Sequence, residues 1–168
     1  ELSSRHALEE AITRIKEKIM NRELTDKQSS DIRYAAIVEV LGRYYAALYR
    51  CDVGLLATTF HPSAQYFTAS SGELLHLDID AYFPIVERRI SPESRGESYE
   101  FSIDSIEFAG PVTAIARMSS SMLSKDFIDL LTIVQIEGEW KIVSKVFHYT
   151  AQADVRSDIK KKKTELEG

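Results

Sequence analysis

The chain has 168 residues, of which 44% are hydrophobic and 28% charged, proportions of an ordinary globular domain that exclude wholesale disorder and collagen-like fibres. Its formal net charge of −5 argues against a general nucleic-acid-binding protein, which is usually basic. The single cysteine, Cys51, excludes an internal disulfide, and no apolar run is long enough for a membrane-spanning helix, so we expect a cytoplasmic protein without membrane contact.

Residues 1–30 predict an N-terminal helix followed by a polar connector. Apolar residues recur there at helical spacing and form one narrow stripe, at Leu8, Ile12, Ile15 and Ile19. Residues 25–30 are polar and end in serines, which favour the start of a new helix. The stripe is expected to pack on its own domain or on a partner copy. The alternative is a docking helix for another protein.

Residues 31–153 are expected to form the main domain, and its first half has helical periodicity. A long helix should end near Arg50, and Asp52 should cap a short second helix that ends at residues 61–62 (His-Pro), because the residue before proline avoids helical geometry. Two short extended segments and a third helix, which begins at Asp78 or Asp80, should follow.

After Gly96 the pattern changes to a period of two, which is typical of strands. Four strands are predicted, around residues 99–104, 112–122, 127–136 and 140–151. Short connections between them imply an antiparallel meander, and helices followed by such a sheet predict an α+β fold with the sheet wrapped over the helices. Residues 154–168 are polar and lysine-rich, so we expect a solvated tail; a basic address or nucleic-acid patch is the alternative.

The last two predicted strands form the most informative stretch. Residues 137–138, Glu-Gly, suit a two-residue hairpin turn, because glycine accepts the positive φ that such turns require. Continued from this turn, strand pairing places Asp129 opposite Val146 and Phe127 opposite His148. The period of two then gathers one set of side chains on a single face, namely Phe127, Asp129, Leu131, Ile133, Trp140, Ile142, Ser144, Val146 and His148.

The opposite face of this hairpin carries both apolar and basic side chains, including Lys141, Val143, Lys145 and Phe147. Because both faces contain apolar residues, both are expected to be covered. One would contact the helices, and the other could contact a second copy of the chain. Phe127 and Trp140 on the first face are candidate ligand-binding residues.

Asp129 is a carboxylate inside an otherwise apolar strand, with His148 predicted diagonally across from it. A buried carboxylate must be paired or neutral. An apolar pocket would raise its pKa and a protonated histidine would lower it. Such tuning suits a general acid or base, with His148 holding the carboxylate or relaying the proton. A structural ion pair or hydrogen bond is the alternative.

Other candidates follow from position. Tyr45 and Tyr66 could donate to a developing oxyanion, and Tyr82 could close the mouth of a pocket, although each could equally belong to the core. His61 could face the pocket or cap the end of a helix. Arg117 could bind an anionic group or point outward into solvent.

No metal or cofactor is expected. His61, Asp129 and His148 would form a set of two histidines and one carboxylate, but nothing in their spacing supports a metal site. The sequence contains no phosphate-binding glycine loop, zinc cysteine pattern or serine nucleophile elbow. Carboxylate, imidazole and phenol groups suit proton transfer next to a carbonyl, as in isomerisation, dehydration or aldol-type cyclisation.

Several segments together carry a family resemblance, at residues 44–48 (YYAAL), Asp52, 60–64 (FHPSA), 129–131 (DLL) and 138–143 (GEWKIV). In this order they resemble the nuclear transport factor 2-like superfamily, and within it the lumazine-binding branch near the SnoaL-like cyclases. Ser63 departs from the family pattern, which usually has aspartate there. The resemblance covers about residues 31–151.

The resemblance implies a cone-shaped α+β fold, in which a strongly curved, mixed or antiparallel sheet wraps around three helices, here with an extra N-terminal helix. It also implies a pocket at the open end and a homodimer through the convex sheet face. Members include isomerases, dehydratases and polyketide cyclases, but also domains that only bind or assemble, so fold alone does not fix function.

Three hypotheses therefore remain. The first is a homodimer that binds a small apolar or aromatic ligand, with or without isomerase, dehydratase or cyclase activity. The second is a non-catalytic dimerisation or interaction module, with the N-terminal helix as its contact element. The third is regulation or transport through a protein partner.

Overall fold

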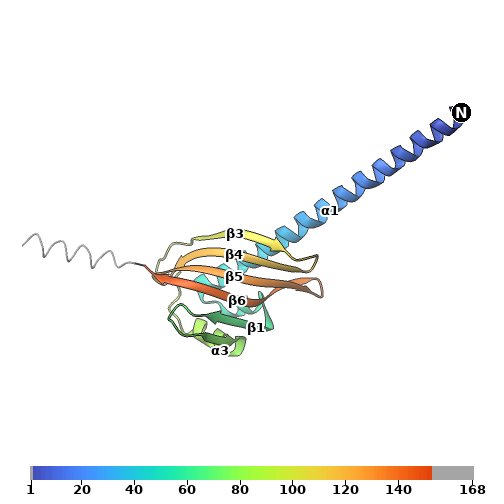
Figure 1. The fold of residues 1–168 in the computed structure, drawn as a ribbon. Helices are drawn as coiled ribbons and strands as arrows, with labels where there is room; N and C mark the ends of the chain where they lie inside the picture. Colours follow the sequence, from blue (N-terminus) through green and yellow to red (C-terminus); the bar gives the residue numbers. More distant parts are fainter. Residues whose placement is uncertain (1, 153–168) are drawn as a thin grey trace, which may run out of the picture. The chain divides into compact units, whose positions relative to one another are not determined.

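The computed structural model describes residues 2–152, so the predicted lysine-rich tail lies outside the described residues. Three helices and six strands follow in chain order (Figure 1): α1 Leu2–Arg50, α2 Val53–Ala57, β1 Phe60–Thr68, β2 Leu75–Asp78, α3 Ile79–Glu87, β3 Phe101–Phe108, β4 Thr113–Met122, β5 Lys125–Ile136 and β6 Glu139–Ala151. The contacts divide the chain into two compact units, residues 1–39 and 40–168, and α1 runs through the division.

The first unit is helical throughout its described residues, so the helix break predicted at residues 25–30 is wrong. The segment contains neither glycine nor proline, and its polar side chains can hydrogen-bond to backbone carbonyls of the same helix. Thr25, for example, donates its hydroxyl to the carbonyl of Asn21 at 2.8 Å. The apolar stripe is exposed at Ile12, Ile15 and Ile19. A partner for this stripe stays a prediction.

In the second unit both predicted helix caps are confirmed. Asp52 accepts a hydrogen bond from the Leu55 amide at 2.8 Å and caps α2, and Asp78 accepts one from the Ala81 amide at 2.9 Å and caps α3. The end of α2 differs from the prediction, because α2 stops at Ala57 and residues 60–68 already form β1. The His-Pro pair at 61–62 therefore lies in a strand.

The six strands form one curved sheet in the order β2-β1-β6-β5-β4-β3. The predicted antiparallel meander from β3 to β6 is confirmed, and β1 pairs with β6 in parallel, so the sheet is mixed. Figure 1 shows β3 to β6 side by side, with β1 next to β6. The α+β class is therefore confirmed.

The core lies on the inner face of this sheet. The sheet contributes alternate residues of β4, β5 and β6, and the helices contribute residues from the end of α1, from α2 and from α3. The largest fully buried side chains of the second unit are Tyr44, Tyr45, Tyr82, Leu41, Leu56, Met118, Leu131, Ile133, Ile142 and Val86.

The β5–β6 hairpin begins as predicted. Glu137 and Gly138 both have positive φ, and Ile133 pairs with Ile142. One residue further the register shifts, because Thr132 pairs with Ser144 and Val143 has no partner. This is a β-bulge, in which two residues of one strand oppose one residue of the other.

The bulge exchanges the two faces of β6 from Ser144 onward. Asp129 pairs with Phe147 and Phe127 pairs with Tyr149, so the predicted partners Val146 and His148 are wrong. Since a shift of one residue moves every following side chain to the opposite face, Lys145, Phe147 and Tyr149 occupy the inner face instead. Val146 and His148 are exposed on the outer face.

Candidate functional site

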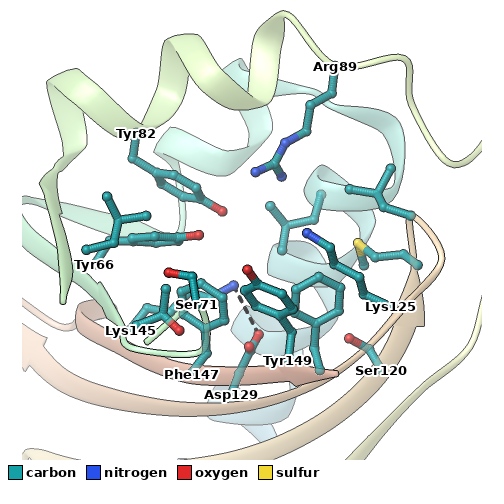
Figure 2. Close-up of a pocket in the computed structure, with 16 residues that line it drawn as sticks. Tyr66, Ser71, Tyr82, Arg89, Ser120, Lys125, Asp129, Lys145, Phe147 and Tyr149 are labelled. Atoms are coloured by element: carbon teal, nitrogen blue, oxygen red, sulfur yellow. Dashed lines mark ion pairs between the residues drawn. The ribbon is translucent and has the colours of Figure 1, made fainter. Parts of the chain in front are cut away.

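A cavity of about 250 Å³ lies in the second unit, between α3 and the inner faces of β1, β4, β5 and β6 (Figure 2). Its lining is mainly apolar and aromatic, with Phe127, Phe147 and Tyr149 along the sheet. Four charged side chains also reach it: Asp129, Lys145, Arg89 and Lys125. Small-molecule sites typically combine such an apolar lining with a few placed polar groups.

Asp129 on β5 and Lys145 on β6 form an ion pair at the cavity. Lys145 Nζ lies 3.2 Å from Asp129 Oδ2, and both residues are only 4% exposed. Tyr44 from α1 completes the cluster: its hydroxyl accepts a hydrogen bond from Lys145 Nζ at 2.6 Å and donates one to Asp129 Oδ2 at 2.7 Å. The bulge positions this cluster, because it places Lys145 on the same face as Asp129.

The second carboxylate oxygen of Asp129 is different. Oδ1 is buried and has no hydrogen-bond partner among the described residues. A buried acceptor without a partner costs about 1–3 kcal/mol, so native proteins rarely retain one without a role. Asp129 also lines the cavity, so its carboxylate lies beside any molecule bound there.

The tyrosines at the site are hydrogen-bond donors at neutral pH. Burial and the neighbouring charge of Asp129 raise the pKa of Tyr44 well above its ordinary value. Burial raises the pKa of Tyr66 to about 12, against the opposing effect of Lys145. Burial also raises the pKa of Tyr82. Figure 2 shows the hydroxyls of Tyr66 and Tyr82 directed into the cavity.

The structure brings four of the sequence-predicted site residues together at the cavity: Asp129, Tyr66, Tyr82 and Phe127. His148 is not among them. It is exposed on the outer face, and its Nδ1 lies 3.0 Å from the hydroxyl of Ser70. The predicted proximity of His148 and Asp129 is therefore wrong, and the cause is the bulge.

Tyr45 is buried away from the cavity lining, in an aromatic cluster. Its ring stacks on Phe101 with centroids 4.6 Å apart, and its hydroxyl accepts a hydrogen bond from the Glu100 amide at 3.2 Å. Burial raises the pKa of its phenol. The structure therefore gives Tyr45 packing partners and no place at the cavity.

The remaining three candidates also lie elsewhere. Arg117 is half exposed and forms an ion pair with Asp104, with 3.7 Å between Nε and Oδ2. His61 Nδ1 accepts a hydrogen bond from the Ser63 amide at 3.1 Å. Trp140 is buried near the hairpin turn, with its ring edge-on to Phe108.

Sequence reasoning missed Tyr44, Lys145, Arg89 and Lys125 as site residues. One signal could have located Lys145: the aromatic residues Phe147 and Tyr149 are out of phase with Trp140 and Ile142, and such a change of phase within one strand indicates a bulge. Arg89 follows a helix and Lys125 begins a strand, and no local pattern connects them.

Residues 2–152 contain no group of histidine, cysteine, aspartate or glutamate side chains arranged to hold a metal ion. None of the helices described there is long and apolar enough to cross a membrane.

The fold and the cavity define a member of the nuclear transport factor 2-like superfamily. More narrowly, the chain belongs to the family described as "Putative lumazine-binding", whose sequence model matches residues 33–148. This confirms the resemblance that the sequence motifs indicated.

Solved structures and a curated protein are similar to the chain. Nuclear transport factor 2-like proteins of unknown function from Shewanella baltica and Silicibacter pomeroyi are each 26% identical, with TM-scores of 0.63 and 0.61. The alignments cover 71% of this chain and 95% of the first structure, and 72% and 98% for the second. Aldolase FrzH from a Cladobotryum species is 29% identical over 124 residues, 73% of this chain and 95% of that protein.

Proposed function

We propose that the chain is an enzyme that binds a small carbonyl compound in the cavity and transfers a proton at the carbon next to the carbonyl. The observation that carries the proposal is the buried, partnerless Oδ1 of Asp129 at the cavity. Aldol, isomerisation, dehydration and cyclisation reactions share this proton transfer. The aldolase name of one relative, which shares 29% identity, supports the choice.

Each group at the site has a role in this step. Asp129 Oδ1 takes the proton from the α-carbon, and the electrons of the C–H bond move to form an enolate. The hydroxyl of Tyr66 or Tyr82 donates to the enolate oxygen, which their raised pKa values permit at neutral pH. Protonated Asp129 then returns its proton, either to a carbon of the enolate or, after the enolate carbon has attacked a second carbonyl, to the oxygen of that carbonyl.

Lys145 balances the charge of Asp129 in this scheme and does not act as a nucleophile. Its Nζ already contacts Asp129 and donates to Tyr44, whereas imine formation requires an amine with a free lone pair. After incubation with a carbonyl compound and cyanoborohydride, peptide mass mapping should therefore find Lys145 unmodified, whereas exposed lysines are alkylated. A stable adduct at Lys145 would instead assign the chemistry to an imine.

The direct test is exchange of α-protons of small ketones and aldehydes in D₂O, followed by NMR. We expect catalysed exchange by the wild type and a loss of about 100-fold or more in Asp129→Asn. Asp126→Asn is the matched control, because Asp126 lies exposed on the same strand. Asp129→Glu, which keeps the charge of the ion pair, should exchange more slowly than the wild type. Equal exchange rates in all four proteins would contradict the proposal.

We also propose a homodimer through the outer sheet face, where apolar side chains of adjacent strands are exposed at Ile115, Ile128, Leu130 and Val146.

The second candidate function, a non-catalytic interaction module, is favoured by the exposed stripe on α1. Light scattering separates the two contacts: Leu130→Glu should give a monomer if the sheet face associates, and Ile15→Glu should do so if α1 associates. A monomeric wild type would contradict both.

A further inference from the structure

The charges that line the cavity do not balance. Three cations, Arg89, Lys125 and Lys145, face a single carboxylate, Asp129. Lys145 and Asp129 pair with each other. Neither Arg89 nor Lys125 has a carboxylate within ion-pair distance in the part of the chain that the structure describes. The cavity therefore carries excess positive charge, although the whole chain is acidic.

The two unpaired cations come from different walls of the cavity. Arg89 follows α3 and lies close enough to Tyr82 for its charge to oppose the burial that raises the pKa of that phenol, whereas Lys125 begins β5 and its Nζ lies 4.2 Å from the centre of the Tyr149 ring. Both side chains are half-buried. Figure 2 shows the guanidinium and the ammonium group directed into the same space, with the Asp129–Lys145 pair below them in this view.

Such an arrangement favours an anion. A cleft lined by one sign of charge concentrates ligands of the opposite sign, and low-dielectric walls strengthen this effect. Arginine offers a planar fork that matches carboxylate and phosphate oxygens, and lysine adds a point charge. The aromatic residues that line the cavity can contact the apolar part of such a ligand.

We propose that the substrate carries an anionic group, a carboxylate or a phosphate, which Arg89 and Lys125 bind while its carbonyl carbon skeleton lies at Asp129. This inference rests on the proposed function and names its substrate class. The cavity of about 250 Å³ falls below the roughly 300 Å³ at which drug-sized sites begin. The substrate is therefore a small keto or aldehyde anion.

The test compares charged probes with uncharged counterparts by NMR titration. The carboxylate pair is 2-oxobutanoate and its amide, and the phosphate pair is dihydroxyacetone phosphate and dihydroxyacetone. For at least one pair, we expect the charged member to bind the wild type at least 10-fold more tightly. This preference should weaken with added salt, as surface-connected charge interactions do. The pair with the larger ratio identifies the anionic group.

Variants then assign the preference to the two cations. Arg89→Gln and Lys125→Gln should each reduce the preference several-fold, and Lys125→Arg should restore most of it. Arg88→Gln is the matched control, because Arg88 is exposed and does not line the cavity. Each variant is first checked for a cooperative melting transition. If a variant fails this check, the salt dependence of binding to the wild type still tests whether charge causes the preference for the anionic probe.

Two results would overturn the inference: equal binding of charged and neutral members in both pairs, or a charged preference that both substitutions leave intact. Failure of the proposed function has a different signature. In that case the anion preference would persist while none of the four probes exchanged α-protons faster than in buffer. Conversely, catalysed exchange that is equally fast for neutral and charged probes would overturn only the anionic substrate class.

Discussion

The β5–β6 hairpin has two halves that differ in what their inner faces carry. Near the turn, the inner face carries buried apolar residues such as Ile133, Ile142 and Trp140. Beyond the bulge at Val143 the same face carries the buried Asp129–Lys145 ion pair and borders the cavity. The unpaired residue Val143 thus separates a half of the hairpin that stabilises the fold from a half that forms the site.

The largest expected effect comes from breaking the ion pair on the site side. Lys145→Met leaves Asp129 buried without its cation, and removal of one member of a buried pair costs about 3–5 kcal/mol. Ile133→Val on the turn side should cost only about 0.5–1.5 kcal/mol. Urea unfolding of both variants measures the difference.

The double variant Asp129→Leu/Lys145→Met sharpens this test. With both charges replaced by apolar groups, stability should return towards that of the wild type, because the desolvation cost disappears together with the attraction. Proton exchange should remain lost. A double variant no more stable than Lys145→Met would show that the pair is not the source of the destabilisation.

A smaller effect concerns the phenols of the cavity. The pKa of Tyr66 is raised to about 12, so between pH 10 and 12 the unfolded chain loses a proton that the folded chain keeps. Stability that is fully present below pH 10 must therefore fall as the pH rises through this window, by on the order of 2 kcal/mol for this residue. Tyr66→Phe should show a shallower decline of the unfolding free energy with pH. Parallel curves for the two proteins would contradict this assignment.

The smallest effects should come from residues that the structure places away from the cavity. Tyr45→Phe removes one hydrogen bond to the Glu100 amide, a loss of about 0.5–1.5 kcal/mol. His148→Ala changes an exposed side chain and should alter stability by about 0.5 kcal/mol or less. Neither substitution should change proton exchange, and a loss of exchange in His148→Ala would restore His148 to the site.

Much of the fold could be predicted because its signals are local. Asp52 and Asp78 are side chains with the chemistry of helix caps, and the alternation after Gly96 indicates strands directly. The continuity of α1 through residues 25–30 could not be read from composition, because polar side chains favour connectors yet can bond back to a helix. The preference of these polar residues for a connector is therefore not realised, and residues 25–30 are helical.

The site was harder to predict because it depends on register. Asp129 could be singled out as a lone carboxylate in an apolar strand, and the candidates Tyr66, Tyr82 and Phe127 also line the cavity, where their roles stay predictions. The partner of Asp129 could not be predicted, because the single bulged residue places Lys145 on the inner face instead of His148. Arg89 is brought to the cavity by tertiary packing alone.

The site depends on this register, and backbone NOEs across β5 and β6 in an isotope-labelled sample test it most directly. We expect cross-strand contacts that join Asp129 to Phe147 and Phe127 to Tyr149. Contacts that join Asp129 to Val146 and Phe127 to His148 would show an unbulged hairpin. Such a hairpin would move Lys145 to the outer face and contradict the site described above.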